Sequence, residues 1–195
     1  MRRKQSQLKK NHSNQLRIIG GQWRGRKLSF PTSEGLRPTP DRVRETLFNW
    51  LAADINGARC LDLFAGSGAL GFEALSRGAG HVDMVDSATA ACQQFKANAE
   101  RLAVQSLNAH QADALSFLAT QPPQYDIIFL DPPFHQNLMA DCLNAICHQK
   151  LLKPSAWVYV EMARDEILPV MPDKWRLHRE KHAGDICYRL FAVGH

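Results

Sequence analysis

The sequence predicts an α/β fold, in which a mostly parallel sheet follows a short N-terminal extension. Short apolar runs alternate with longer amphipathic stretches from Cys60 onward, which is the pattern of βαβ units. The run at 125–130 is almost entirely apolar, as a central parallel strand covered on both faces should be. A glycine-rich turn at 62–71 joins a strand pattern to a helix pattern. Together these observations favour an open α/β sheet over an all-helical or all-β fold.

Length and composition indicate one domain with an appendage. The chain has 195 residues, of which 45% are hydrophobic and 22% charged, so wholesale disorder is excluded. It contains no apolar run of about 18 residues, and its N-terminus lacks the apolar stretch of a secretory signal. We therefore expect a cytoplasmic protein without a membrane partner. Its five cysteines lie in apolar surroundings without a CxxC pair, which predicts reduced core thiols at Cys60, Cys92, Cys142, Cys147 and Cys187.

Charge is divided unevenly along the chain. Residues 1–33 hold nine Lys or Arg and no acidic residue, whereas the remainder holds 15 basic and 19 acidic residues. A basic N-terminal region can displace counterions from phosphates, which indicates a polyanionic partner. A solvated tail that only keeps the protein in solution is the alternative interpretation.

The N-terminal extension divides into two parts. Residues 1–15 are polar and basic, which predicts a flexible arm. Residues 16–52 contain two short extended segments around Gly20, Gly21 and Gly25, which predict a basic hairpin. A helix should follow, with Thr39 as N-cap and Pro40 at its first position, because one helical face carries Val43, Leu47, Trp50 and Leu51.

Residues 53–195 form the predicted main domain. Strands are expected near 59–64, 81–86, 107–111, 125–131 and 156–162. Helices are expected between them, near 68–78, 88–103, 113–119 and 135–148. Two final strands, near 174–181 and 185–193, should form a closing antiparallel pair.

The glycine-rich turn indicates a nucleoside cofactor. Gly66, Gly68 and Gly71 satisfy G-x-G-x-x-G, and Asp86 follows Gly66 by 20 residues, so a dinucleotide is one candidate. Asp62 argues against it, because a carboxylate at the strand end would repel a pyrophosphate at the helix N-terminus. S-adenosylmethionine carries an ammonium and a sulfonium and no phosphate, so it removes this conflict. A tight turn without a ligand is the structural alternative.

Two further carboxylates fit an adenosine. Asp86 ends the second predicted strand, where it can accept hydrogen bonds from both ribose hydroxyls. Asp113 follows the third strand and could accept the adenine amino group, although an N-cap of the next helix fits it equally well.

The motif Asp131-Pro132-Pro133-Phe134 follows the central apolar strand. Consecutive prolines remove backbone donors, so the turn presents the Asp131 carboxylate and carbonyl oxygens as acceptors beside an aromatic plane. This set matches the exocyclic amino group of a base: Asp131 and the Pro132 carbonyl would accept its hydrogens and aim the lone pair at a methyl donor, while Phe134 stacks. A proline-punctuated loop with Phe134 in the core is the alternative.

The chain carries a glycine-rich turn, then the acidic ribose partner Asp86, then the Asp131-Pro132-Pro133-Phe134 motif. Motifs in this order resemble those of class I S-adenosylmethionine-dependent methyltransferases that modify nucleobase amino groups. The chain from about Arg17 onward resembles the RsmD family of bacterial 16S rRNA guanine-N2 methyltransferases. The resemblance is carried by Arg17-Ile18-Ile19-Gly20-Gly21, Gly25-Arg26, Arg37-Pro38-Thr39, Arg42-Val43-Arg44-Glu45-Thr46-Leu47-Phe48-Asn49 and Asp62-Leu63-Phe64-Ala65-Gly66-Ser67-Gly68.

This resemblance implies a Rossmann-like seven-stranded sheet with one antiparallel strand. It also implies direct methyl transfer to N2 of guanine 966 in 16S rRNA of the small ribosomal subunit or an assembly intermediate. We expect catalysis by Asp131, Pro132, Pro133 and Phe134. The expected residues of the cofactor site are Asp62, Phe64, Gly66, Ser67, Gly68, Asp86, Ser87, Asp113 and Ala114.

Positive charge and an aromatic ring in the extension suit looped RNA. The expected RNA contacts are Arg17, Trp23, Arg24, Arg26, Lys27, Arg37, Arg42 and Arg44. We expect the protein to be a monomer. We also expect no metal site, because the spacing of Cys142, Cys147 and His148 does not place three ligands on one helical face. The remaining rivals are a DNA adenine-N6 or other amino-methyltransferase, a nicotinamide-dependent oxidoreductase, and a non-enzymatic RNA-binding protein.

Overall fold

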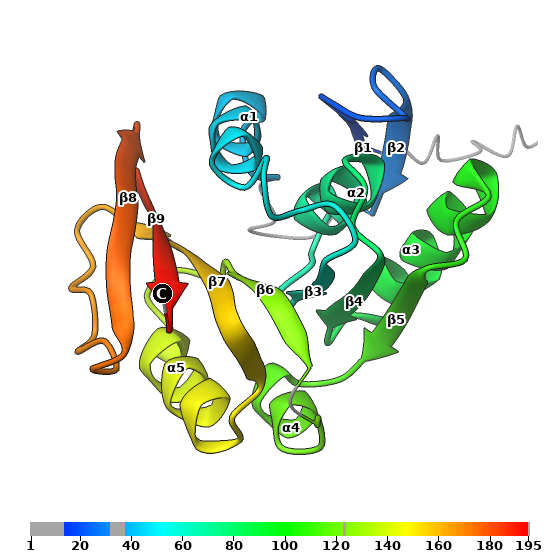
Figure 1. The fold of residues 1–195 in the computed structure, drawn as a ribbon. Helices are drawn as coiled ribbons and strands as arrows, with labels where there is room; N and C mark the ends of the chain where they lie inside the picture. Colours follow the sequence, from blue (N-terminus) through cyan, green and yellow to red (C-terminus); the bar gives the residue numbers. More distant parts are fainter. Residues whose placement is uncertain (1–13, 32–37, 123, 195) are drawn as a thin grey trace, which may run out of the picture.

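One large sheet forms the centre of the molecule, and the computed structural model describes residues 14–31, 38–122 and 124–194. Its strands are β3 (Arg59–Asp62), β4 (His81–Asp86), β5 (Leu107–Gln111), β6 (Tyr125–Leu130), β7 (Leu152–Ala163), β8 (Trp175–Ala183) and β9 (Ile186–Val193). Their spatial order is β5-β4-β3-β6-β7-β9-β8, and β9 is antiparallel to both of its neighbours (Figure 1). The predicted α/β fold, a mostly parallel seven-stranded sheet with one antiparallel strand, is confirmed.

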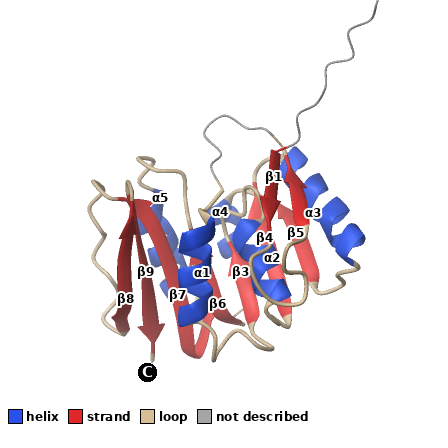
Figure 2. Ribbon diagram, turned by 90° about the horizontal axis from the view of Figure 1, so that it is seen from above, coloured by secondary structure: helices blue, strands red, loops and turns tan. Residues whose placement is uncertain are grey.

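Helices cover both faces of this sheet. The helices are α1 (Asp41–Trp50), α2 (Ala69–Ser76), α3 (Thr89–Leu102), α4 (Ala114–Leu118) and α5 (Leu138–His148). The first three helices share one apolar cluster with one sheet face, and α4 and α5 share a second cluster with the other face (Figure 1). Viewed from above, α1 lies over β6 and β7, and α2 lies over β4 (Figure 2). The result is a three-layer arrangement that leaves the strand ends open.

Each predicted strand and helix of the main domain is present, although several ends differ. Strand β7 begins at Leu152, four positions before the predicted start at 156, and a register shift interrupts its pairing with β6. Helix α5 begins at Leu138 rather than near 135, because Asn137 adopts a left-handed conformation with φ of 55°. The central strand is confirmed as buried, with five of its six side chains in the core.

The described part of the N-terminal extension packs on the face that carries α1–α3. Strands β1 (Asn14–Arg17) and β2 (Lys27–Phe30) form the predicted antiparallel hairpin. Leu16, Leu28 and Phe30 belong to the same apolar cluster as α2 and α3, so the hairpin shares the core of the main domain. Residues 1–13 of the predicted arm at 1–15 lie outside the described residues, whereas Asn14 and Gln15 belong to β1, so the prediction of a flexible arm is wrong for these two residues.

A buried ionic cluster fastens this extension. Glu73 of α2 accepts hydrogen bonds from the backbone N–H groups of Ile19 and Gly20 at 2.9 and 2.8 Å. The same carboxylate pairs with the guanidinium groups of Arg44 at 3.4 Å and Arg77 at 2.8 Å. Glu73 is fully buried, so removing one partner would leave an uncompensated charge in the core. The hairpin is therefore held in place by both apolar packing and charge.

The cysteines agree with the sequence-based expectation of core thiols. All five cysteines are free thiols, and four are buried, whereas Cys147 is half-buried. Among the described residues, no helix is both long enough and apolar enough to cross a membrane.

Candidate active site

A cavity of about 1370 Å³ lies at the carboxyl ends of the central strands. Ligands of open α/β sheets bind at this edge, because the chain connections leave a crevice there. The cavity walls come from the ends of β3, β4, β6 and β7, from the segment before α1, and from the β8–β9 turn. Eight predicted cofactor residues and the four predicted catalytic residues line it: Asp62, Phe64, Gly66, Ser67, Asp86, Ser87, Asp113, Ala114, Asp131, Pro132, Pro133 and Phe134. Gly68 is the predicted residue that does not.

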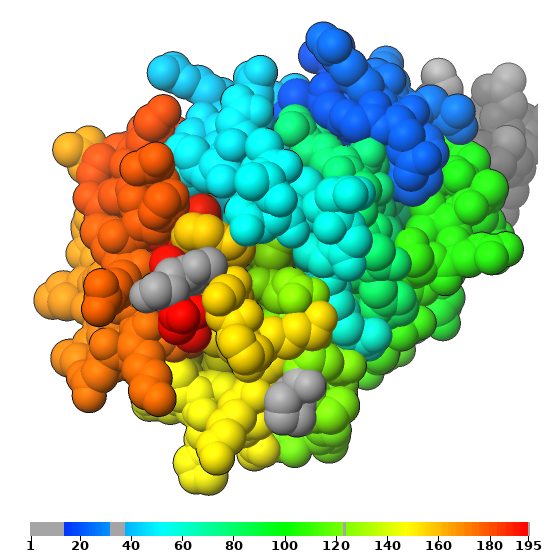
Figure 3. Space-filling view, viewed as in Figure 1, coloured from blue at the N-terminus to red at the C-terminus, as the bar shows by residue number. Residues whose placement is uncertain are grey.

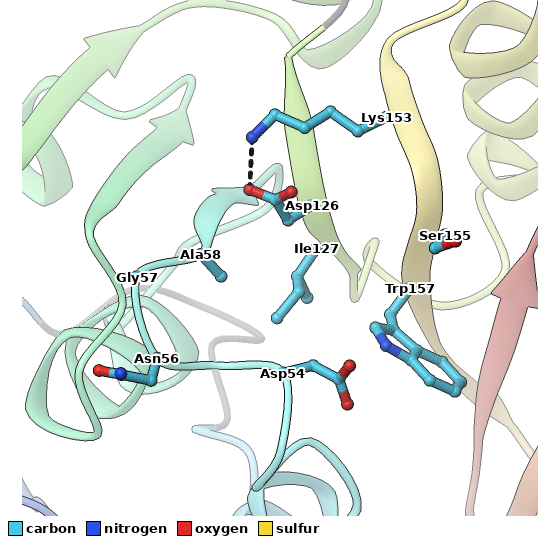
Figure 4. A pocket seen from close by; sticks show the side chains of 9 residues that line it. All are labelled: Asp54, Asn56, Gly57, Ala58, Asp126, Ile127, Lys153, Ser155 and Trp157. Atoms are coloured by element: carbon cyan, nitrogen blue, oxygen red, sulfur yellow. Dashed lines mark hydrogen bonds and ion pairs between the residues drawn. The ribbon is translucent and has the colours of Figure 1, made fainter.

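A smaller pocket of about 300 Å³ lies at the opposite edge of the sheet, beside the first residues of β3 and β6. An ion pair between Lys153 and Asp126 at 2.7 Å lies along its wall (Figure 4). None of the residues singled out from the sequence lines this pocket. The candidate site is therefore the large cavity.

The glycine-rich turn forms one end of the cavity. Gly66 and Gly68 have φ of 51° and 79°, a conformation that side chains with a Cβ rarely adopt. A Cβ on Gly68 would also lie 2.9 Å from Phe72 and 3.0 Å from Met84. Both glycines are thus needed for this turn, which brings backbone to the cavity wall.

Asp62 ends β3 beneath this turn and is 2% exposed. Its Oδ2 accepts a hydrogen bond from the backbone N–H of Gly71 at 2.9 Å, so the carboxylate ties the strand to α2. Burial raises the pKa of Asp62 to about 7, with Asp86 adding to the shift and the Gly71 hydrogen bond opposing it. A cationic group in the cavity would favour the ionised form. The site accordingly fits a positively charged ligand better than a phosphate.

Asp86 ends β4 and closes the same turn. Its Oδ2 accepts a hydrogen bond from the Gly66 N–H at 2.9 Å, and its Oδ1 accepts one from Ala88 at 2.8 Å. Each carboxylate oxygen keeps a second acceptor position, so two ligand hydroxyls can still bind. Asp113 behaves differently, because its Oδ1 accepts a hydrogen bond from the Ser116 N–H at 3.1 Å and caps α4. The N-cap interpretation of Asp113 is confirmed, and its carboxylate also lines the cavity.

Asp131 and the two prolines follow β6 at the middle of the cavity. Asp131 is half-buried, Pro132 is buried, and Phe134 is an exposed aromatic residue at 36% of its surface. Loss of solvent at the carboxyl group, together with the nearby charges of Glu161 and Asp62, raises the pKa of Asp131 well above its usual value. Because Phe134 lines the cavity and is exposed, the core alternative for this ring is wrong. The motif instead presents an acceptor and an aromatic surface to the cavity.

Thr39 was missed as a site residue. Helix α1 begins at Asp41 with Pro40 as its N-cap residue and no capping side chain, so the prediction of Thr39 as N-cap is wrong. The Thr39 hydroxyl donates instead to Asp131 Oδ2 at 3.4 Å, and Thr39 is 6% exposed. Arg44 holds this segment by donating from Nε to the Thr39 carbonyl at 3.2 Å. The extension therefore contributes directly to the cavity.

Glu161 was also missed. It lies on β7, is 2% exposed and lines the cavity near Asp131. The Tyr159 hydroxyl donates to Glu161 Oε2 at 2.6 Å. A single Glu in a strand pattern does not indicate a site residue. Glu161 reaches the cavity only because β7 pairs with β6.

The residues predicted to contact RNA differ in their exposure. Most of them are exposed on the hairpin and on the start of α1: Arg17, Arg24, Arg26, Lys27 and Arg42. The hairpin and the segment around α1 lie next to each other on one face, coloured blue and cyan in Figure 3. Trp23 is half-buried against the core cluster, and Arg37 lies outside the described residues.

The structure places Arg44 in the core rather than on the RNA surface that was predicted for it. Its side chain is 1% exposed and makes ion pairs with Glu73 at 3.4 Å and Asp41 at 2.6 Å. It also donates to the Arg17 carbonyl at 3.0 Å. A guanidinium buried in this way cannot reach RNA, so the expected RNA contact at Arg44 is wrong.

One group of metal-type ligands lies on β8 and β9, where atoms of Glu180, His182 and Cys187 lie within 4.8 Å of one another. Arg189 forms an ion pair with Glu180 at 2.5 Å, so the carboxylate already has a cationic partner. These residues do not line the cavity.

Comparisons with known proteins agree with this geometry. The family model described as "Conserved hypothetical protein 95" matches residues 16–192. The chain is 50% identical to ribosomal RNA small subunit methyltransferase D of Escherichia coli K12 over 185 residues, which cover 94% of this chain and 93% of the relative. It resembles the solved structure of the putative methyltransferase yhhF from Escherichia coli with a TM-score of 0.87 and 47% identity, covering 92% and 98% of the two chains.

A more distant solved structure shows the same fold. It is the 16S rRNA N2 G1207 methyltransferase RsmC of Thermus thermophilus, in complex with AdoMet and guanosine. The TM-score is 0.66 with 22% identity, and the match covers 94% of this chain and 50% of that one. The chain thus shares its fold with this methyltransferase.

Proposed function

Because the chain belongs to the Conserved hypothetical protein 95 family, the family of ribosomal RNA small subunit methyltransferase D, we propose that it methylates 16S rRNA. Specifically, we propose transfer of a methyl group from S-adenosylmethionine to the exocyclic N2 of a guanine. Guanine 966 is the target that resemblance to the family implies. The substrate is the small ribosomal subunit or an assembly intermediate of it.

The observation that carries this proposal is the position of Asp131 within the cavity. The sheet order places β6 next to β3, so the Asp131 motif and the glycine-rich turn lie side by side. A ligand on the glycine turn and a base on Phe134 would therefore meet at Asp131. This arrangement supports transfer of a group between two bound molecules.

Residues at the glycine end fit S-adenosylmethionine. The partly satisfied carboxylate of Asp62 would hold its ammonium, and Asp86 would accept its ribose hydroxyls. Ala114 and the capped start of α4 would flank the adenine. When bound, S-adenosylmethionine supplies an electrophilic methyl group on its sulfonium.

Residues at the other end prepare the amino group. Asp131 and the Pro132 carbonyl would accept its two hydrogens, which favours a pyramidal nitrogen whose lone pair points to the methyl group. Nitrogen forms the new bond to carbon as the carbon–sulfur bond breaks, and the nitrogen then loses one proton to Asp131. Stacking on Phe134 would hold a flipped or looped base, which costs only a few kcal/mol to extrude. No covalent enzyme intermediate is required.

The hairpin supplies the proposed RNA surface. Arg24, Arg26 and Lys27 are exposed on one short turn and strand, where their charges can contact phosphates. Arg42 extends this charge toward the segment that carries Thr39. The Glu73 cluster fixes the hairpin relative to the cavity, so bound RNA would be held in register with Asp131.

The test is methyl transfer from labelled S-adenosylmethionine to small ribosomal subunits that lack the modification, with naked 16S rRNA and DNA assayed in parallel. Nucleoside analysis should find N2-methylguanosine at one position in subunits. Label in N6-methyladenine of DNA would overturn the substrate, and label at several guanines would overturn the single target.

Cofactor identity has an independent test. S-adenosylhomocysteine should raise the unfolding temperature of the purified protein, because a ligand that binds only the folded state stabilises it. NAD and NADP should leave that temperature unchanged. Stabilisation by a nicotinamide cofactor would favour an oxidoreductase instead.

A further inference from the structure

Glu161 is the second carboxylate at the substrate end of the cavity. In the parallel pairing of β6 with β7, Leu130 lies opposite Val160, so Asp131 and Glu161 follow as neighbours at the carboxyl ends of the two strands. Both residues line the cavity. The same strand pair therefore presents two acceptor groups side by side.

The sheet order separates Glu161 from the cofactor residues. Asp86 and Asp62 end β4 and β3, on one side of β6, whereas Glu161 lies on β7 on the other side. A base whose amino group is held at Asp131 extends away from the methyl donor. Glu161 is thus placed to contact the base, and the cofactor residues are not.

One oxygen of Glu161 is already fixed. The Tyr159 hydroxyl donates to Oε2 at 2.6 Å, and in the described part of the chain this is the hydrogen bond that the structure gives the Glu161 side chain. Oε1 is left as an acceptor in a group that is only 2% exposed. Because Glu161 lines the cavity, this second oxygen can accept a hydrogen bond from a donor on a bound ligand.

The edge of guanine supplies such a donor. Its N2 amino group and its N1–H lie next to each other, and both donate hydrogen bonds, whereas N1 of adenine accepts one. We propose that Glu161 accepts the N1–H of the target guanine while Asp131 and the Pro132 carbonyl hold its N2 amino group. This inference rests on the proposed function and names Glu161 as the residue that selects guanine.

The simpler interpretation makes Glu161 a partner of Tyr159 alone. Glu161→Gln separates the two, because glutamine keeps the size of the side chain and an oxygen for the Tyr159 hydroxyl. Its amide can also turn to donate a hydrogen bond, which a carboxylate cannot do. The substitution should therefore change which base is accepted, which loss of a purely structural contact would not do.

The experiment compares guanine with 2-aminopurine at the target position of 16S rRNA, prepared by ligation and reconstituted into small subunits. 2-Aminopurine keeps the amino group at C2 but has an acceptor in place of N1–H. The unsubstituted protein should prefer guanine by about a hundredfold or more in kcat/KM. In Glu161→Gln this preference should fall by at least about tenfold, with 2-aminopurine gaining as guanine loses.

The matched control is Glu100→Gln, an exposed position on α3 away from the cavity, which should keep the original preference. An unchanged preference in Glu161→Gln would overturn the inference. Equal use of both bases by the unsubstituted protein would overturn it as well, without reliance on any variant. Absence of methylation on guanine-containing subunits would count against the proposed function instead.

Discussion

The two ends of the cavity hold their carboxylates in different ways. At the cofactor end, Asp62 and Asp86 accept hydrogen bonds from backbone N–H groups of Gly71, Gly66 and Ala88. At the substrate end, Asp131 and Glu161 accept hydrogen bonds from side-chain hydroxyls of Thr39 and Tyr159. Backbone donors are fixed by the fold, whereas hydroxyl donors depend on the residue at one position. The cofactor end is therefore set by the general architecture, and the substrate end by local sequence.

This difference separates binding from chemistry. Substitutions at the cofactor end should alter affinity for S-adenosylmethionine, and those at the substrate end should alter turnover or base choice. Thr39 supports this separation, because the hydroxyl that donates to Asp131 comes from the N-terminal extension rather than from the strands of the sheet. The extension thus contributes to substrate handling as well as to the proposed RNA surface.

The largest effect is expected at Asp131. Asp131→Ala removes the acceptor that orients the amino group and receives its proton, so kcat should fall by about 10³-fold or more. The dissociation constant for S-adenosylhomocysteine should change by less than about threefold, because the cofactor contacts are on other strands. Single-turnover methylation and calorimetric titration would measure the two quantities.

Asp131→Asn is the matched control, since it keeps one acceptor oxygen and should retain more activity than the alanine variant. Unchanged turnover in Asp131→Ala would overturn the catalytic role. A parallel loss of cofactor affinity would remove the proposed separation between the two ends.

The next effect is expected at the cofactor end. Asp86→Ala removes the acceptor for two hydroxyls and also frees the Gly66 N–H, so affinity for S-adenosylhomocysteine should fall by about a hundredfold. At saturating cofactor, kcat should recover to within a few-fold. Titration calorimetry followed by turnover at high cofactor concentration gives both values, and a kcat that stays low at saturation would contradict the division.

A smaller effect, about tenfold, is expected from pH. Burial raises the pKa of Asp131 well above its usual value and raises the pKa of Asp62 and Glu161 to about 7, and each of the three must be ionised to perform its proposed role. A group with this pKa is about one-tenth ionised at pH 6, so kcat/KM should be at least about tenfold lower there than at pH 8. The titratable groups that face Glu161 are Asp131, Tyr159 and, on β9, Tyr188. A flat profile would contradict this prediction.

The stability of the unliganded protein should fall as pH rises, whereas its activity should increase. An acid whose pKa is higher in the folded chain binds its proton more tightly there, so unfolding becomes easier as pH rises from about 4 to about 7. Glu161→Gln removes this penalty and should be more stable than the original protein at pH 8, by up to about 3 kcal/mol. The difference should vanish near pH 4. Urea unfolding at the two pH values measures it.

The strands and the glycine turn were predictable because their signals are local. The apolar run at 125–130 and the alternation of patterns identify strands without reference to neighbours. The position of Asp62, Asp86 and Asp131 at strand ends follows from the same patterns, and parallel strands bring such ends to one edge. The sequence pattern alone is therefore sufficient to group these three carboxylates in one site.

Glu161 and Thr39 were not predictable in this way, because each depends on contacts between distant segments. Glu161 reaches the cavity through the pairing of β7 with β6, and Thr39 through the packing of the extension. For Arg44 a local signal existed: it precedes Leu47 and Phe48 by three and four residues, on the buried face of α1. The charge of Arg44 by itself indicates a surface position, whereas Glu73 neutralises that charge in the core.

The smallest effect on catalysis is expected at the hairpin, and it tests whether the extension has a binding role separate from that of Thr39. Replacing Arg24, Arg26 and Lys27 by glutamine should make the logarithmic salt dependence of RNA binding less steep by about 2, since each phosphate contact on single strands contributes about 0.7. At saturating RNA, kcat should stay within a few-fold, because none of these side chains lines the cavity.

The matched control removes the same charge elsewhere, at the exposed residues Arg176, Arg179 and Lys181 of β8. If net charge alone attracts RNA, the logarithmic salt dependence of RNA binding should become less steep by the same amount in both triple variants. A loss confined to the hairpin variant would instead show that phosphates contact that surface. Filter binding from about 50 to about 400 mM salt would decide between these outcomes, because a contact changes the slope whereas a distant charge is screened beyond about 10 Å at 0.1 M salt.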